Sequence, residues 1–103
     1  MKKIIDGKRY DTSTAEEIGC KENGYRPNDF NYECETLYRT KTGNYFLHGE
    51  GHAKSDYATV RGNERSWGQA IIPLSEAQAF EWASHKLKPE YFEQVFAHLI
   101  TDA

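Results

Sequence analysis

The chain has 103 residues, a length typical of one domain, so we expect a single domain over residues 1–103 with one modest core. This length excludes a large barrel or a doubly wound sheet with a cofactor crevice. No stretch is apolar for long enough to span a membrane, and the basic start of the chain lacks the apolar region of a signal peptide. We therefore expect a protein of the cytoplasm.

Aromatic residues indicate a folded protein in spite of a polar composition. Hydrophobic residues make up 38% of the chain, but aromatic residues make up 14%, and each aromatic side chain buries a large area. The two cysteines, Cys20 and Cys34, form no C-x-x-C pair. In a reducing compartment we expect them to stay thiols with a structural role.

The first third of the chain predicts a hairpin, an ambiguous segment and a loop. Asp6-Gly7 between "KKII" and "KRYDT" is a two-residue turn signal, because both residues tolerate positive φ. The segment "STAEEIGCKE" is compatible with a short helix that starts in a capping box. It is also compatible with a strand, because Gly19 would weaken a helix. The stretch "YRPNDFNYE" predicts a loop.

The middle of the chain contains the clearest strand pair, "CETLYRT" and "NYFLHG", joined by "KTG". We expect Gly43 to take the left-handed position of this hairpin loop. The polar stretch over residues 52–66 predicts an extended loop with a short helical turn near residues 56–60. The stretch "WGQAII" predicts a further strand that ends at Pro73.

The last third predicts two helices. Ser75 followed by Gln78 forms a capping box at the start of "EAQAFEWASHKL". Pro89 suits the first position of a second helix, "PEYFEQVFAHLI", whose apolar residues have helical spacing and face the sheet. The sequence therefore predicts an α+β fold, with a small antiparallel sheet of about four strands and two C-terminal helices packed on one face.

His48, Glu50 and His52 stand at alternate positions and would share one face of a strand. Such neighbours lie about 6.6 Å apart along the strand, too far apart to converge on one ion without a bend. A bend at the intervening glycines would let the three side chains converge on an ion, so a metal-dependent enzyme stays open as an alternative. No other pattern indicates a catalytic nucleophile or a phosphate-binding loop. The residues alone therefore favour neither an enzyme nor a bound cofactor.

The segment from residue 11 to residue 35 carries seven carboxylates and two basic residues, a local charge of −5. No basic stripe suited to phosphates is present, which disfavours direct nucleic-acid binding and admits a basic protein partner. Aromatic residues among the carboxylates are typical either of a recognition surface or of a loop fixed onto its domain. The candidate partner-binding residues are Asp11, Glu16, Glu17, Glu22, Asp29, Glu33 and Glu35 with Tyr25, Phe30 and Tyr32.

Three stretches together resemble a group of small proteins of phages and other mobile elements. They are "IIDGKRYDTSTAEEIG", "ETLYRTKTGNYFLHGEG" and "IIPLSEAQAFEWA". The group includes anti-CRISPR proteins, which inhibit type I and particularly type I-C interference complexes. The resemblance implies a stoichiometric inhibitor that binds a DNA-recognition subunit and blocks target DNA, by DNA mimicry or by shape recognition. The alternative is a general protein-interaction module of a phage or mobile element with another partner.

Overall fold

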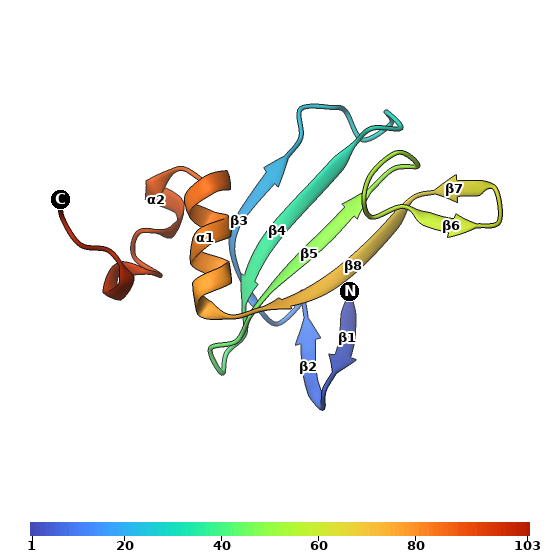
Figure 1. The fold of residues 1–103 in the computed structure, drawn as a ribbon. Coiled ribbons are helices and arrows are strands. Elements are labelled where there is room, and N and C mark those ends of the chain that lie inside the picture. The colour runs from blue at the N-terminus through green and yellow to red at the C-terminus, as the bar shows by residue number, and fades with distance from the viewer.

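The computed structural model covers residues 1–103 and has an α+β fold built on a four-stranded antiparallel sheet, as predicted (Figure 1). The strand order of this central sheet is β3-β4-β5-β8, and two small hairpins, β1-β2 and β6-β7, extend from it. None of the helices has the length and apolar composition needed to cross a membrane. In chain order the elements are β1 (Lys2–Ile5), β2 (Lys8–Asp11), β3 (Glu16–Glu22), β4 (Glu33–Arg39), β5 (Tyr45–Gly51), β6 (Thr59–Arg61), β7 (Glu64–Ser66), β8 (Gly68–Leu74), α1 (Glu76–Lys86), α2 (Pro89–Phe92) and the 3-10 helix η1 (Ala97–Leu99).

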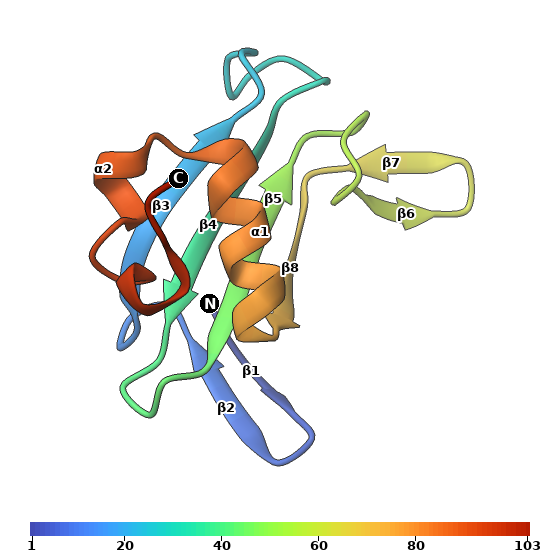
Figure 2. The same ribbon diagram turned by 60° about the vertical axis from the view of Figure 1, so that its left-hand side comes forward.

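The helical segment covers one face of the central sheet, where the main core lies (Figure 2). Alternate residues of β4 and β5 point toward α1, because successive side chains of a strand lie on opposite faces. Ala79 and Ala83 let α1 approach the sheet closely, and both are fully buried. The core cluster consists of Ile18, Leu37, Tyr45, Leu47, Ala79, Ala83, Phe92 and Phe96.

The β1-β2 hairpin packs on part of the other face. Its turn is the predicted one, with φ of 51° at Asp6 and 77° at Gly7. The ring of Tyr10 meets Phe46 edge-on at 5.4 Å, and Ile71 completes this second, smaller core. Polar side chains occupy the remainder, which we call the polar face: Glu17, Cys20, Glu22, Cys34, Thr36, His48, Glu50 and Gln69.

The ambiguous segment "STAEEIGCKE" contains strand β3, which pairs with β4 along its whole length. The register shifts between Glu17 and Gly19, and the extra residue, Ile18, is buried in the main core. A side chain at Gly19 would overlap the end of the Leu87 side chain, which follows α1, so a larger residue here would require Leu87 to move. Long-range pairing and packing therefore settle an element that local sequence left open.

Residues 52–66 do not form the predicted extended loop with a helical turn. They contain the β6-β7 hairpin, which turns at Gly62, where φ is 60°. Glycine with positive φ at the first central position favours a two-residue hairpin turn. Every residue of the two strands is exposed, so neither shows the alternation of apolar and polar residues that marks a half-buried strand.

The second predicted helix is also wrong in its extent. It begins at Pro89 as expected, but α2 is a single turn, and only the 3-10 helix η1 follows. Phe96 leaves helical geometry, with φ of −109° and ψ of 22°, while its ring is fully buried. Strand β8 also continues one residue past Pro73, which an edge strand tolerates.

Candidate functional site

The predicted partner-binding residues occupy several different environments in the structure. Two of them hold turns. Asp11 Oδ1 accepts hydrogen bonds from the hydroxyl and the backbone N–H of Ser13, at 2.7 and 2.9 Å. Asp29 Oδ1 accepts the backbone N–H and the side-chain amide of Asn31, at 2.7 and 3.0 Å. These hydrogen bonds lower the pKa of both carboxyl groups.

Glu35 lies between the sheet and the helix rather than in solvent. Its Oε1 accepts the indole N–H of Trp82 at 3.1 Å, and its Oε2 accepts a short hydrogen bond from the hydroxyl of Tyr57. The Tyr57 ring lies where a side chain at Gly49 would be, directly across the sheet from Glu35. The carboxylate of Glu35 thus links β4 to α1 and to the segment before β6. Its role is structural, and it is not available to a partner.

Two more of the predicted residues contact the segments on either side of the β6-β7 hairpin. Glu33 Oε1 accepts the backbone N–H of Asp56 at 2.9 Å. Tyr32 is buried and stacks on Trp67, with ring centroids 5.6 Å apart. For these two residues and Glu35, the structure favours the interpretation in which the residues fix a loop onto the domain.

Tyr57→Phe is expected to lower the free energy of unfolding near neutral pH by about 1.5 kcal/mol, because it removes a hydrogen bond to a carboxylate. Burial, followed by the hydrogen bond to Glu35, raises the pKa of Tyr57. A raised pKa stabilises the fold below the unfolded value of about 10, and that contribution is lost as the pH rises above it. Urea unfolding from pH 7 to 11 should therefore show that the difference in free energy of unfolding between wild type and variant becomes smaller above pH 10. A constant difference would contradict this assignment.

Three predicted carboxylates project from edge strand β3. Glu16 forms an ion pair with Arg39 at 2.8 Å. Glu17 and Glu22 make no side-chain hydrogen bond or ion pair within the chain, and both are exposed on the polar face. Because of the bulge, their partners on β4, Tyr38 and Cys34, are only four residues apart, which corresponds to about 13 Å along a strand. These two are therefore the predicted carboxylates of β3 that remain free for a partner.

Two predicted aromatic residues are exposed in the loop between β3 and β4. Tyr25 is 48% exposed and Phe30 is 57% exposed. Asn23 anchors the loop, since its side chain bonds the carbonyl of Asn31 at 2.8 Å and the N–H of Glu33 at 3.1 Å. The loop follows directly after Glu22, so one end of the sheet carries a free carboxylate and two exposed rings.

Glu50 joins this surface, although the sequence presented it only as a possible metal ligand. In the register of the sheet, Cys34 pairs with Glu22 on one side and with Glu50 on the other. Glu22 and Glu50 therefore flank the same residue on the polar face. The "KTG" hairpin fixes the pairing of Cys34 with Glu50, whereas the pairing of Cys34 with Glu22 depends on β3, whose strand the sequence left open. We define the candidate surface as Glu17, Glu22, Glu50, Tyr25 and Phe30.

The predicted alternative of a metal site has little geometric support. His48 and Glu50 do share the polar face, but His48 Nε2 lies 2.8 Å from Gln69 Oε1. His52 lies beyond the end of β5, where its ring packs edge-on against Phe30 at 4.8 Å. No group of three or more His, Cys, Asp or Glu side chains in the chain is arranged to hold a metal ion.

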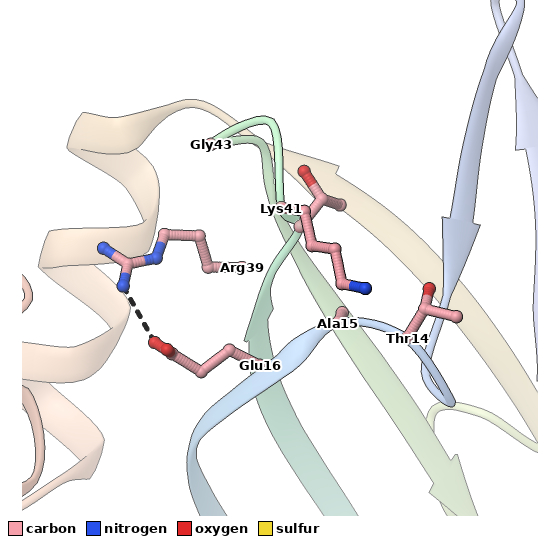
Figure 3. A pocket seen from close by; sticks show the side chains of 7 residues that line it. Thr14, Ala15, Glu16, Arg39, Lys41 and Gly43 are labelled. Carbon is pink, nitrogen blue, oxygen red and sulfur yellow. Dashed lines mark hydrogen bonds and ion pairs between the residues drawn. The ribbon is translucent and has the colours of Figure 1, made fainter.

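A hollow of about 530 Å³ lies beside the β4–β5 turn, at the end of the sheet where β3 begins and away from the loop that carries Tyr25 and Phe30 (Figure 3). Figure 3 shows Arg39 extended toward Glu16, while Lys41 and Thr14 lie on the other side. The lining is mainly polar, with Ala15 as the sole hydrophobic residue. The only carboxylate that lines this hollow is that of Glu16, which is paired with Arg39. The hollow therefore adds no free carboxylate to the candidate surface.

Comparison of the chain with protein-family models, with curated proteins and with solved structures finds no significant match.

Proposed function

We propose that the protein is a non-enzymatic, stoichiometric inhibitor of the anti-CRISPR kind. It binds a DNA-recognition subunit of a type I CRISPR complex in the bacterial cytoplasm and blocks target DNA binding. The observation that supports this best is the candidate surface, on which Glu17 and Glu22 have no partner within the chain and Tyr25 and Phe30 are exposed in the loop that follows Glu22. The sequence resemblance supplies the class of partner.

Electrostatic attraction gives this surface a way to compete with DNA. A cleft that binds DNA presents basic side chains to successive phosphates, and spaced carboxylates attract the same cleft. Glu17, Glu22 and Glu50 lie on one face of the sheet and supply three such charges. Charge complementarity of this kind mainly accelerates association and excludes wrong partners.

Aromatic contacts supply the larger share of the affinity in this proposal. The net charge is only −3, and several of the predicted carboxylates are held by contacts within the chain. Exposed rings such as Tyr25 and Phe30 offer large, rigid contact areas, and residues of this kind often dominate binding energy. We therefore assign affinity to the two rings and association rate to the carboxylates.

A gel-shift competition with a purified type I-C complex tests the proposal. Excess protein should prevent the complex from binding its target DNA. The double variant Tyr25→Ala/Phe30→Ala should weaken inhibition at least tenfold, whereas Glu17→Gln/Glu22→Gln should mainly slow association and reduce its salt dependence. Tyr91→Ala is the matched control, because Tyr91 is an equally exposed aromatic residue on α2. DNA binding that persists at large excess of the protein would remove the proposal.

The second candidate is an interaction module of a phage or mobile element with a different partner. The small number of free carboxylates favours it, because recognition through Tyr25 and Phe30 does not require a DNA-binding partner. Capture from a bacterial lysate, with identification of the bound protein by mass spectrometry, separates the two candidates. Loss of that protein in the Tyr25→Ala/Phe30→Ala variant would place its binding on the same surface.

A further inference from the structure

Two thiols lie next to each other on the polar face. The Sγ atoms of Cys20 and Cys34 are 3.1 Å apart, although neither residue is in a disulfide. Cys20 is exposed on the edge strand β3, and Cys34 is buried on β4. In the sheet register Cys20 faces Thr36 while Cys34 faces Glu22, so the two cysteines are diagonal neighbours.

We propose that Cys20 and Cys34 form an oxidisable dithiol, which hydrogen peroxide converts into a cross-strand disulfide. In the first step the thiolate of Cys20 attacks one peroxide oxygen, the O–O bond breaks, and Cys20 becomes a sulfenic acid as hydroxide leaves and takes up a proton to form water. In the second step the sulfur of Cys34 attacks the sulfenic sulfur. The S–O bond breaks, and the hydroxyl leaves with the Cys34 proton as water. Two thiols and one peroxide thus give one disulfide and two waters.

The surroundings of the two thiols assign these roles. Exposure makes Cys20 the one that a dissolved oxidant reaches first. Burial, followed by the hydrogen bond with Cys20, raises the pKa of Cys34 to about 12, which keeps it a protonated thiol in the resting protein. Hydrogen bonds with the side chains of Thr36 and Tyr32 act in the opposite direction. Cys34 is therefore protected from direct oxidation and stands next to the sulfur that it would attack.

Closure of the disulfide needs only a small movement. The sulfur atoms must approach by about 1 Å to reach the bonded distance of about 2.05 Å. Strand β3 is an edge strand, so no further strand holds it away from β4. The new bond would close a loop over residues 20–34, which contains Tyr25 and Phe30. Oxidation would thus restrict the motion of the segment that carries both rings of the candidate surface.

The experiment oxidises the reduced 103-residue chain with about one equivalent of hydrogen peroxide. The expected product is a monomer that has lost two hydrogen atoms in mass, has no free thiol, and returns to the starting state with dithiothreitol. Its thermal midpoint should rise by on the order of 10 °C, because the crosslink restricts the unfolded chain. Peptide mapping should find residues 20 and 34 joined. Two thiols that persist after this treatment would overturn the proposal, as would a disulfide-linked dimer.

Two variants separate the roles of the thiols, with dimedone as a trap for sulfenic acid. Cys34→Ser should accumulate the dimedone adduct at Cys20 after peroxide treatment, whereas the wild type should form little adduct because Cys34 removes the sulfenic acid. Cys20→Ser should resist peroxide altogether while it stays folded. Equal adduct in wild type and Cys34→Ser would overturn the assignment of Cys34. If Cys34→Ser does not fold, the peptide map and thiol count of the wild type decide the proposal alone.

Discussion

Gly49→Ala is expected to lower the free energy of unfolding by about 3 kcal/mol, although the substitution adds one methyl group. A Cβ atom at position 49 would overlap the ring of Tyr57, which lies against the Gly49 backbone. Forcing the ring away strains the packing and breaks the hydrogen bond between Tyr57 and Glu35, which leaves a half-buried carboxylate with one fewer donor. Urea unfolding followed by tryptophan fluorescence measures the loss.

A double-mutant cycle provides the control for this prediction. In the background Tyr57→Ala the ring is gone, so the added cost of Gly49→Ala should fall below about 1 kcal/mol. An undiminished cost would show that the backbone of β5, rather than the Tyr57 ring, requires glycine at this position.

Phe96→Ala is expected to lower the free energy of unfolding by about 4 kcal/mol, the upper range for loss of a buried ring. Phe96 is fully buried, stacks on Tyr45 with centroids 5.3 Å apart, and packs against Phe80 at 5.4 Å. It attaches the C-terminal segment, which is not one continuous helix, to the core. Urea unfolding measures the total loss, and hydrogen exchange should show residues 89–100 opening first.

Tyr91→Ala is the matched control for Phe96→Ala in the same segment. Tyr91 is 58% exposed, and its loss should change the free energy of unfolding by no more than about 0.5 kcal/mol. A loss below 1 kcal/mol in Phe96→Ala would mean that the C-terminal segment contributes little to the stability of the sheet.

Local signals predicted the elements that depend on local chemistry. The capping box is confirmed, since the Ser75 hydroxyl accepts the N–H of Gln78 at 3.1 Å and the Gln78 side chain accepts the N–H of Ser75 at 2.9 Å. The loop of the main hairpin is confirmed as well, with φ of 88° at Gly43. In both cases residues within five positions of each other determine the backbone, so one sequence window contains the cause.

Elements that depend on distant partners were missed or left open. Strand β3 is a strand because β4 pairs with it, and β6-β7 has no buried face from which a pattern could arise. The second helix stops early, although the apolar spacing of its residues favours continuation. The ring of Phe96, in this segment, stacks on Tyr45, which lies more than fifty residues earlier in the chain. No local sequence pattern encodes that contact.

The candidate site shows the same limit in its charges. A count of carboxylates between residues 11 and 35 treats all seven alike. Glu35 differs because its hydrogen-bond donors, Tyr57 and Trp82, stand 22 and 47 residues away. Glu17 and Glu22 differ because their carboxylates make no hydrogen bond or ion pair within the chain. Sequence alone therefore located the acidic segment but could not separate its structural carboxylates from its free ones.

The central sheet has two unpaired edges, and each carries a feature that discourages addition of another strand. Strand β8 contains Pro73, which cannot donate a backbone hydrogen bond to a neighbour. Strand β3 carries Glu16, Glu17, Lys21 and Glu22, four charges in seven residues. If a second copy approached β3 antiparallel in the centred register, Glu16 of each chain would face Glu22 of the other, and these two like-charged pairs would oppose the pairing, whereas Glu17 would face Lys21. The carboxylate of Glu22, which the proposal offers to a basic partner, would thus also weaken this mode of self-association.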